Sequence, residues 1–271
     1  MRCTKMHGAG NSFVVTENLR GELQGEDLSV LALRLCLEQE ADGLIVVVPA
    51  QDADFGMLFY NADGSLGEMC GNGARCLARY GVEHSLAPDP ENIRIRATAG
   101  LVFGRRISRE QYEIRLNDPS VIDLHRPAFD GEKECGCCYV ELGEPGIPHA
   151  VVMASAAELD DLDALRLRGR ALRFSPAFPR GANVSFVCPA GEGAVRAITY
   201  ERGVEDFTLA CGTGCGAIAV SLALTGRAPD GRVEIDMPGG HLSVALRREG
   251  DTARDIFLTG PTAVVSEGET T

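Results

Sequence analysis

The sequence predicts an α+β protein of two pseudo-symmetric halves, each a half-barrel of short strands wrapped around a central helix. Two observations lead to this fold class. The stretches Asn61–Cys76 (NADGSLGEMCGNGARC) and Glu201–Val220 (ERGVEDFTLACGTGCGAIAV) both carry Cys-Gly-x-Gly before a helical pattern, and they lie about half a chain length apart. The second pattern, AIAVSLAL, is apolar on nearly every face, which is typical of a helix enclosed by other structure.

Short strands outnumber helices in the periodicity of the sequence. Apolar alternation between turn residues predicts the strands Phe13–Thr16, Leu44–Val48, Phe55–Tyr60, Ile93–Ala97, Tyr112–Leu116, Tyr139–Leu142, Ala150–Met153, Asn183–Val187, Val195–Tyr200, Val233–Ile235 and Leu242–Leu246. A period of 3.6 predicts the helices Asp27–Glu38, Asn72–Val82, Ala157–Arg166 and Thr213–Leu224.

The segment Leu116–Phe129 contains prolines and has no clean period, so we expect it to be the linker between the halves. The first half then covers residues 1–117 and the second covers residues 118–261. We expect residues 262–271 to return to the first half as a strand, and the active site to lie in the cleft between the halves.

Composition narrows the function classes. The chain has 271 residues, of which 45% are hydrophobic and 24% charged, as in ordinary globular proteins. Its net charge of −13 argues against nucleic-acid and anionic-membrane partners, which need basic surface. No apolar run approaches the roughly 20 residues that span a bilayer, and the first residues lack a signal-like apolar region. We therefore expect a cytoplasmic protein with a small-molecule substrate.

Ten cysteines are many for such a chain, and without a secretion signal they do not predict a disulfide framework. The ECGCC cluster lacks Cys-x-x-Cys spacing, and alternation on a strand turns Cys138 away from Cys137, so we expect no metal there. One alternative from another class stays open, a thiol redox or zinc-binding module that uses Cys70, Cys211 and this cluster. Stoichiometric metal in the purified protein would support it.

The repeated Cys-Gly-x-Gly turn suggests acid–base chemistry. A cysteine at a helix N-terminus meets unpaired N–H groups and the positive end of the helix dipole, so we expect the pKa of Cys70 and of Cys211 to fall below about 8.5. The same N–H groups can hold a carboxylate. If the two turns face each other, one thiol lies on each side of the α-carbon of a bound acid. One thiol can then remove a proton and the other deliver one, without metal or cofactor.

These motifs resemble those of the diaminopimelate epimerase family, whose members interconvert LL- and meso-diaminopimelate without a cofactor. The resemblance covers essentially the whole chain. The segments KMHGAGNSFVV, NADGSLGEMCGNGAR, GIPHAVV, GANVSFV, YERGVEDFTLACGTG and MPGGHL follow one another in family order. The resemblance implies the two-domain fold of that family, a role in lysine and peptidoglycan precursor synthesis, and a homodimer.

The resemblance also implies roles for individual residues. Cys70 and Cys211 become the two acid–base thiols, and His149 and Glu201 become residues that tune them. The substrate-binding residues that it implies are Asn11, Asn61, Gly71, Asn72, Asn183, Glu201, Arg202, Gly212 and Thr213.

Three positions depart from the family pattern. Ser12 stands where an aspartate is usual, Gly43 where some members carry a side-chain amide, and Ile147 where several carry an asparagine that binds the distal end of the substrate. Two readings within this architecture therefore remain, a diaminopimelate epimerase and a racemase of another amino acid such as histidine. A phenazine-biosynthesis-type isomerase would share the fold but would lack the paired cysteines.

Overall fold

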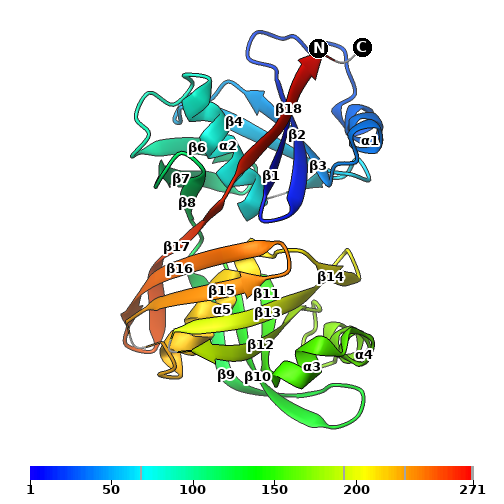
Figure 1. Ribbon diagram of the computed structural model, residues 1–271, viewed down its shortest axis with the longest axis vertical. Helices are drawn as coiled ribbons and strands as arrows, with labels where there is room; N and C mark the ends of the chain where they lie inside the picture. Colours follow the sequence, from blue (N-terminus) through cyan, green and yellow to red (C-terminus); the bar gives the residue numbers. More distant parts are fainter. Residues whose placement is uncertain (68, 192, 229, 270–271) are drawn as a thin grey trace. The chain divides into compact units, whose positions relative to one another are not determined.

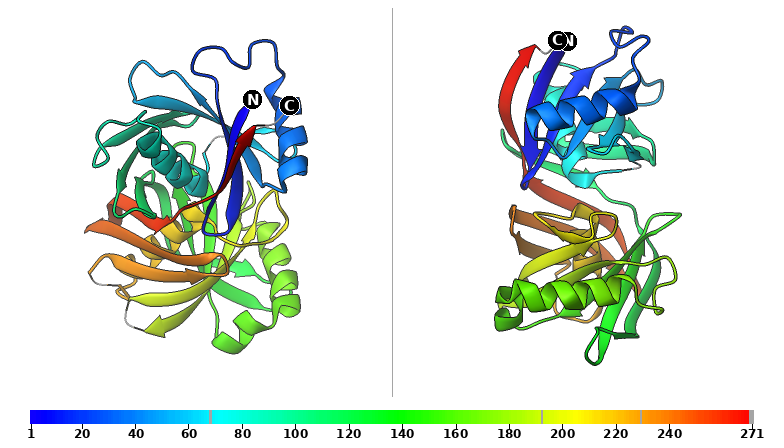
Figure 2. Two further views of the ribbon diagram at one scale, coloured as in Figure 1. Left: turned by 45° about the horizontal axis from the view of Figure 1, so that its top comes forward. Right: turned by 90° about the vertical axis from the view of Figure 1, so that its right-hand side faces the viewer.

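The computed structural model describes residues 1–67, 69–191, 193–228 and 230–269. The chain divides into two compact units (Figures 1 and 2). Unit 1 comprises Met1–Arg115 with Thr259–Thr271, and unit 2 comprises Leu116–Leu258. Within the described ranges, none of the helices has the length and apolar composition that spanning a bilayer requires.

Unit 1 surrounds one helix with strands and carries a second helix outside them. Its elements are β1 (Arg2–Gly8), β2 (Asn11–Glu17), α1 (Leu28–Gln39), β3 (Gly43–Val48), β4 (Phe55–Asn61), β5 (Leu66–Gly67), α2 (Gly71–Glu83), β6 (Ile93–Ala97), β7 (Gly100–Arg106), β8 (Gln111–Arg115) and β18 (Ala263–Glu269). The strands pair in the order β18, β1, β2, β3, β4, β6, β7, β8, with β5 on β4.

Unit 2 repeats this arrangement. Its elements are β9 (Pro119–Phe129), β10 (Glu134–Leu142), β11 (Ile147–Met153), α3 (Ala156–Asp160), α4 (Leu162–Arg173), β12 (Asn183–Gly191), β13 (Ala194–Glu201), β14 (Asp206–Thr208), α5 (Gly212–Leu224), β15 (Arg232–Met237) and β16 (Gly240–Glu249). The strands pair in the order β9, β10, β11, β12, β13, β15, β16, with β14 on β13. The remaining strand, β17 (Thr252–Pro261), begins in unit 2 and ends in unit 1.

The two units match step by step. The parallel steps are β2–β3 and β4–β6 in unit 1, and β11–β12 and β13–β15 in unit 2, while the other pairings named above are antiparallel. In each unit the enclosed helix, α2 or α5, lies in chain order between the two strands of the second parallel pair (Figure 1). The predicted pseudo-symmetric α+β fold is confirmed.

Elements that are buried on every side are apolar throughout, as strand β3 of unit 1 and the enclosed helix α5 of unit 2 show. In β3, Val46 packs toward α1, whereas Ile45 lies against the first turn of α2 at Gly73. Such strands read as continuous apolar runs, here GLIVVV. In α5, all the residues except Thr213 are buried. A helix covered on every side in this way has no polar face, as its sequence predicted.

Local capping sets where the outer helices begin. Asp27 accepts hydrogen bonds from the N–H groups of Ser29 and Val30 at the start of α1. The single predicted helix over 157–166 is wrong, because the chain forms α3 and then α4. Asp161 adopts a non-helical conformation (φ −93°, ψ 79°) and its carboxylate accepts from the N–H of Ala164, so it begins a second helix.

The predicted linker over 116–129 is also wrong, because most of it forms β9. This strand pairs only with β10 among the described strands of unit 2, so it lies at an edge. A proline lacks the N–H that an inner strand needs but is tolerated at an edge or at a strand start, which suits Pro119 and Pro127. The prolines suggested a linker, but in the structure they lie in an edge strand.

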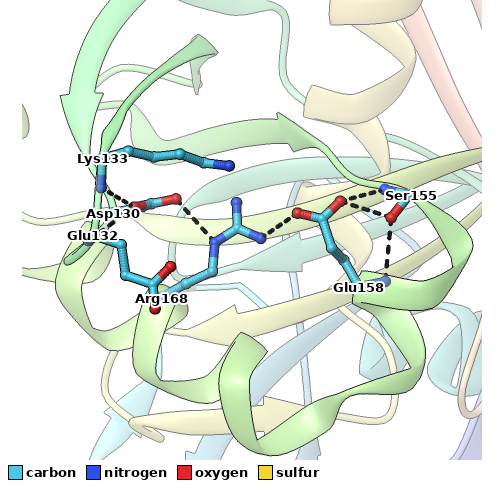
Figure 3. A network of polar contacts seen from close by, with 6 residues as sticks. All are labelled: Asp130, Glu132, Lys133, Ser155, Glu158 and Arg168. Carbon is cyan, nitrogen blue, oxygen red and sulfur yellow. Dashed lines mark hydrogen bonds and ion pairs between the residues drawn. The ribbon is translucent and has the colours of Figure 1, made fainter.

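A buried ionic network fastens the β9–β10 turn of unit 2 to its helices (Figure 3). The carboxylate of Asp130 is fully buried and accepts from the N–H groups of Glu132 and Lys133 and from Nε of Arg168, at 2.9 Å. Arg168 also donates to Glu158, the residue that closes a capping box with Ser155. One guanidinium therefore joins a turn, the start of α3 and the middle of α4.

Candidate active-site residues

Each unit presents one cysteine at the start of its enclosed helix. Cys70 is the N-cap of α2 and Cys211 the N-cap of α5, with similar backbone angles (φ −125°, ψ 113° and φ −119°, ψ 106°). The N–H of Gly73 donates to Sγ of Cys70 at 3.4 Å. Since both cysteines follow the same strand pairings, the two thiols occupy equivalent positions in the repeated fold.

The expected low pKa of Cys211 is not what the structure shows. Burial raises the pKa of the Cys211 thiol well above its usual value, and the negative charge of Glu201 adds to the rise. The N–H of Gly214 and the hydroxyl of Thr213 oppose these effects without reversing them. The sequence showed the helix N-terminus but not the desolvation, which here is the stronger effect. Cys211 is therefore a protonated thiol, a potential acid.

His149 lies in β11 beside Thr213 in the first turn of α5. Nε2 of His149 and Oγ1 of Thr213 are 3.0 Å apart, and that oxygen is 3.8 Å from Sγ of Cys211. Burial, with the charge of Arg202, lowers the pKa of His149 to about 3, so the ring is neutral. Its contact with the thiol region therefore runs through a hydroxyl.

Asn183 and Arg202 lie next to this group, and their polar atoms are partly used within unit 2. Asn183 accepts from the backbone N–H of Arg202 at 2.8 Å and donates to the carbonyl of Pro148 at 3.3 Å. Nη1 of Arg202 donates to the carbonyl of Arg180 at 3.2 Å. Glu201 accepts from the hydroxyl of Thr208 at 2.8 Å, and burial raises the pKa of its carboxyl. The amide of Asn183 thus holds the strand end that carries Glu201 and Arg202.

In unit 1 the predicted residues gather at the start of α2. Asn72 follows Gly71 in the first turn, and its Nδ2 donates to Oδ1 of Asn11 at the start of β2. Asn61 ends β4, where its Nδ2 donates to the hydroxyl of Ser65 at 2.9 Å. Gly71 and Asn72 are buried, while Asn11 and Asn61 are half-buried. The predicted residues thus form two sets, one in each unit.

The repeated register relates these two sets. Phe13 pairs with Gly43 and Gly43 with Asn61, while His149 pairs with Asn183. The pairing of Val184 with Tyr200 places Asn183 opposite Glu201. Equivalent positions are therefore Phe13 and His149, Gly43 and Asn183, and Asn61 and Glu201. Asn11 and Ile147 are also equivalent, since Asn11 lies two residues before Phe13 and Ile147 two residues before His149.

Two of the three departures from the family pattern, at Gly43 and Ser12, are explained by contacts with neighbouring residues. A Cβ at Gly43 would lie 2.5 Å from the ring of Phe59 and 2.8 Å from the carbonyl of Tyr60, so this chain has filled the space of a side chain with that ring. Ser12 binds Asp42, whose carboxylate accepts from the hydroxyl of Ser12 at 3.3 Å as well as from its backbone N–H at 2.7 Å. Ile147 is half-buried at the start of β11, and the structure gives no reason for its choice.

The family model described as diaminopimelate epimerase matches residues 3–110 and 143–265. The chain belongs to the diaminopimelate epimerase family. A diaminopimelate epimerase of Hydrogenobaculum sp. (strain Y04AAS1) is 35% identical over 280 residues, 99% of this chain and 98% of that one. One of Desulforudis audaxviator (strain MP104C) is 36% identical over 287 residues, 99% of each chain. The predicted family is confirmed.

A solved structure supports the fold of this diaminopimelate epimerase family member at lower identity. The Bacillus anthracis phenazine biosynthesis protein of the PhzF family is 14% identical, has a TM-score of 0.77 and is covered over 99% of its chain, with 100% of this chain. At that identity the likeness concerns the fold alone.

The ECGCC cluster of this family member does not collect its thiols in one place. Cys137 is buried in the core beneath α3 and α4 with Tyr139, while the thiol of Cys138 donates to the carbonyl of Leu124 at 3.4 Å and lies near Ser221 in α5. The two neighbours thus face opposite sides of β10, as alternation predicts. Cys135 packs against the same core as Cys137, so the three thiols are divided between two faces of β10 and do not form the single cluster that the thiol redox or zinc-binding alternative uses.

Sequence reasoning about single sites missed Arg75, although the family motif Cys-Gly-Asn-Gly-x-Arg contains it. Its guanidinium is fully buried and donates to Oδ1 of Asn72 at 2.8 Å. An arginine inside an otherwise enclosed helix was the available signal, since such residues are almost never fully buried unless paired.

Proposed function

We propose that this protein is an epimerase that interconverts LL- and meso-diaminopimelate by two-base catalysis with Cys70 and Cys211. The observation that carries the proposal is the equivalent placement of one cysteine before each enclosed helix, in a chain of the diaminopimelate epimerase family. A thiolate on one face of the α-carbon removes the proton as a thiol on the other face delivers one.

The carbanionic transition state needs stabilisation without a cofactor. We assign this to the N–H groups of Gly71 and Asn72 in α2, and of Gly212 and Thr213 in α5. The N–H groups at a helix N-terminus favour negative charge, and they need no reorganisation during the reaction. Asn11, Asn61, Asn183, Glu201 and Arg202 are proposed to bind the rest of the substrate. We assign the tuning of the thiols to His149 and Glu201.

The protonation of Cys211 fits this scheme. A two-base reaction requires one thiolate and one thiol at the start of each turnover, and burial keeps Cys211 protonated. The neutral ring of His149 and the hydroxyl of Thr213 can orient that thiol without adding charge. In the direction that starts with this ionisation, Cys211 acts as the acid.

Lysine and peptidoglycan precursor synthesis is the proposed role, in the cytoplasm and as a homodimer. All ten cysteines are free in the structure, which suits a reducing compartment. Light scattering of the purified protein would test the dimer.

A panel of substrates in heavy water tests the proposed function. We expect solvent deuterium at the α-carbon of the product and the highest kcat/KM for LL-diaminopimelate, because Arg202 and the asparagines provide a positive charge and donors for a second carboxylate. Proton NMR of the α-position and chiral chromatography measure both quantities. A higher kcat/KM for histidine or lysine would favour the racemase reading, whose sequence support is Ile147.

The Ile147→Asn variant refines this test. Restoring one neutral hydrogen bond should change the KM for diaminopimelate by no more than about tenfold, since such a bond contributes about 0.5–1.5 kcal/mol. A larger gain would show that Ile147 selects a different substrate.

Crowding the thiol should lower activity without removing it. A Cβ at Gly214 would lie 3.1 Å from Sγ of Cys211, 3.2 Å from its Cβ and 3.3 Å from Oγ of Ser185. Gly214→Ala should therefore displace the sulfur by a few tenths of an ångström. We expect a loss of rate smaller than the roughly 100-fold that a shift of about 1 Å can cause. Steady-state kinetics measures the loss of kcat.

Gly136→Ala is the matched control, because nothing lies within 4 Å of the Cβ that it adds. It should keep wild-type kcat. Equal kcat in Gly214→Ala and wild type would contradict a role for the sulfur position.

A further inference from the structure

A chain of side-chain hydrogen bonds runs under the first turn of α2. Nη2 of Arg75 donates to Oδ1 of Asn72 at 2.8 Å, and Nδ2 of Asn72 donates to Oδ1 of Asn11 at 2.5 Å. Arg75 and Asn72 are buried, whereas Asn11 is half-buried at the start of β2. This series of hydrogen bonds therefore begins at the buried positive charge of Arg75 and ends at Asn11, near the surface of unit 1.

The direction of this chain follows from the chemistry of arginine. A guanidinium has five N–H donors and no acceptor, and it keeps its charge in proteins. Asn72 must therefore turn its oxygen toward Arg75, which leaves its amide nitrogen to face Asn11. Asn11 must in turn receive that N–H with its own oxygen. Its Nδ2 then points away from the chain as a donor.

The outer end of the chain is available to a ligand. In the described part of the chain, Nδ2 of Asn11 has no hydrogen-bond partner. This atom is also absent from the buried polar atoms without partners, so it is accessible to solvent. A half-buried asparagine that shows only its N–H₂ group can bind a carboxylate oxygen but repels an ammonium group.

The described residues of unit 2 form no such series of hydrogen bonds, although the fold of unit 2 is equivalent. Gly216 stands at the position of Arg75 in α5, Thr213 at that of Asn72, and Ile147 at that of Asn11. Even a Cβ at Gly216 would lie 2.7 Å from Leu116 and 2.9 Å from Leu142, so an arginine has no room there. The hydrogen bonds from Arg75 through Asn72 to Asn11 are thus specific to unit 1. Such a difference between the units allows them to bind the two ends of one substrate differently.

We propose that Arg75 is a positioning residue that acts through Asn72 and turns the amide of Asn11 so that it donates to a carboxylate group of the substrate. This inference rests on the proposed function for its substrate, an amino acid with a carboxylate at the bound end. Arg75 itself does not touch the substrate. It selects which of the two groups of the Asn11 amide the substrate meets.

Kinetics of single and double variants tests the coupling. Arg75→Met should raise the KM for diaminopimelate about ten- to hundredfold, the range for a lost hydrogen bond to a charged group, with a much smaller change in kcat. In an Asn11→Ala background, Arg75→Met should add no further rise in KM, because the two substitutions remove one interaction. Arg75→Lys keeps a donor and should recover most of the affinity, and it serves as the test if the methionine variant does not fold.

Arg79→Met is the matched control on the same helix. Arg79 is also buried, but it pairs with Glu83 and donates to the carbonyl of Thr262, which holds β18 rather than Asn11. Its loss should lower the melting temperature and leave KM unchanged. An equal rise in KM for Arg79→Met, or an undiminished effect of Arg75→Met in the Asn11→Ala background, would overturn the proposal.

A second measurement needs no substrate. In wild-type protein with ¹⁵N-labelled asparagine, the side-chain N–H₂ protons of Asn72 should be protected from solvent exchange and those of Asn11 should exchange freely. Arg75→Met or Arg75→Lys should respectively remove or keep this difference. If wild type shows the difference but does not epimerise diaminopimelate, the proposed function fails and the amide orientation stands. Equal exchange in wild type would overturn the orientation itself.

Discussion

Replacing either thiol should abolish epimerisation while the fold survives. In Cys70→Ala one face of the α-carbon loses its base or acid, and in Cys211→Ala the other face does. A positioned general acid or base contributes about 10²–10⁴-fold, and neither thiol can cross the substrate to replace the other. We therefore expect kcat to fall by at least about 100-fold in each variant. Product formation and deuterium incorporation in heavy water measure it.

Two buried cysteines provide controls for the loss of a thiol as such. Cys76 lies in α2 and Cys215 in α5, both fully buried, and burial raises the pKa of Cys76 to about 12. Cys76→Ala and Cys215→Ala should each destabilise the protein slightly by leaving a small cavity, yet retain activity. Activity in Cys70→Ala or Cys211→Ala above about a hundredth of wild type would refute the two-base scheme.

The sequence predicted the elements whose pattern has a direct physical cause. The apolar runs GLIVVV and AIAVSLAL are buried from all sides, so β3 and α5 were recognisable by composition alone. The cysteine before each enclosed helix was visible because glycines flank it. Strand β7, with arginines at its end, lacks this signal and was not predicted, whereas β18, with glutamates, was expected as a strand without a periodic apolar pattern. Their pairing partners stabilise them instead.

Features that depend on distant packing could not be predicted. The pKa of Cys211 is raised by burial and by the charge of Glu201, and the residues next to Cys211 in the sequence do not indicate how buried it is. The amide of Asn183 resembled a free substrate ligand, yet it bonds the backbone of Arg202 and Pro148. Arg75 looked like one more position in a motif until its bond to Asn72 connected it to Asn11. Asn11 and Pro148, which these contacts reach, are remote in sequence from Arg75 and Asn183.

The repeated fold also shows how symmetry is broken at the predicted site. An amide occupies the Asn11 position only in unit 1, where unit 2 has Ile147. The reverse holds at the next pair of equivalent positions, where unit 2 has Asn183 and unit 1 has Gly43, covered by Phe59. Thus the departures at Gly43 and Ile147 are positions at which one unit carries a side-chain amide and the other does not. A repeated scaffold can keep equivalent thiols while the surrounding side chains distinguish the two ends of a substrate.

Removing Arg168 should destabilise unit 2 by about 3 kcal/mol at neutral pH, because it leaves the buried carboxylate of Asp130 without its counter-charge. Glu158 adds little to this value, since its side chain is 40% exposed. For Arg168→Met we expect a melting temperature lower by about 6–12 °C. The chain has no tryptophan, so far-ultraviolet circular dichroism is the suitable probe. Arg166→Met is the control, because its pairs with Asp163 and Asp206 are exposed and should contribute under about 1 kcal/mol.

The difference in stability between wild type and Arg168→Met should disappear at low pH. Burial alone would raise the pKa of Asp130, but the N–H groups of Lys133 and Glu132 together with Arg168 lower it below its usual value. A carboxyl with a lowered pKa in the folded state contributes stability above the unfolded pKa of about 3.9, and this contribution is lost as the pH falls through the folded value. The wild-type advantage should therefore be constant from about pH 5 to 8 and shrink below about pH 4. An advantage that persists undiminished at about pH 2 would show that Arg168 stabilises the helix by packing rather than by its charge on Asp130.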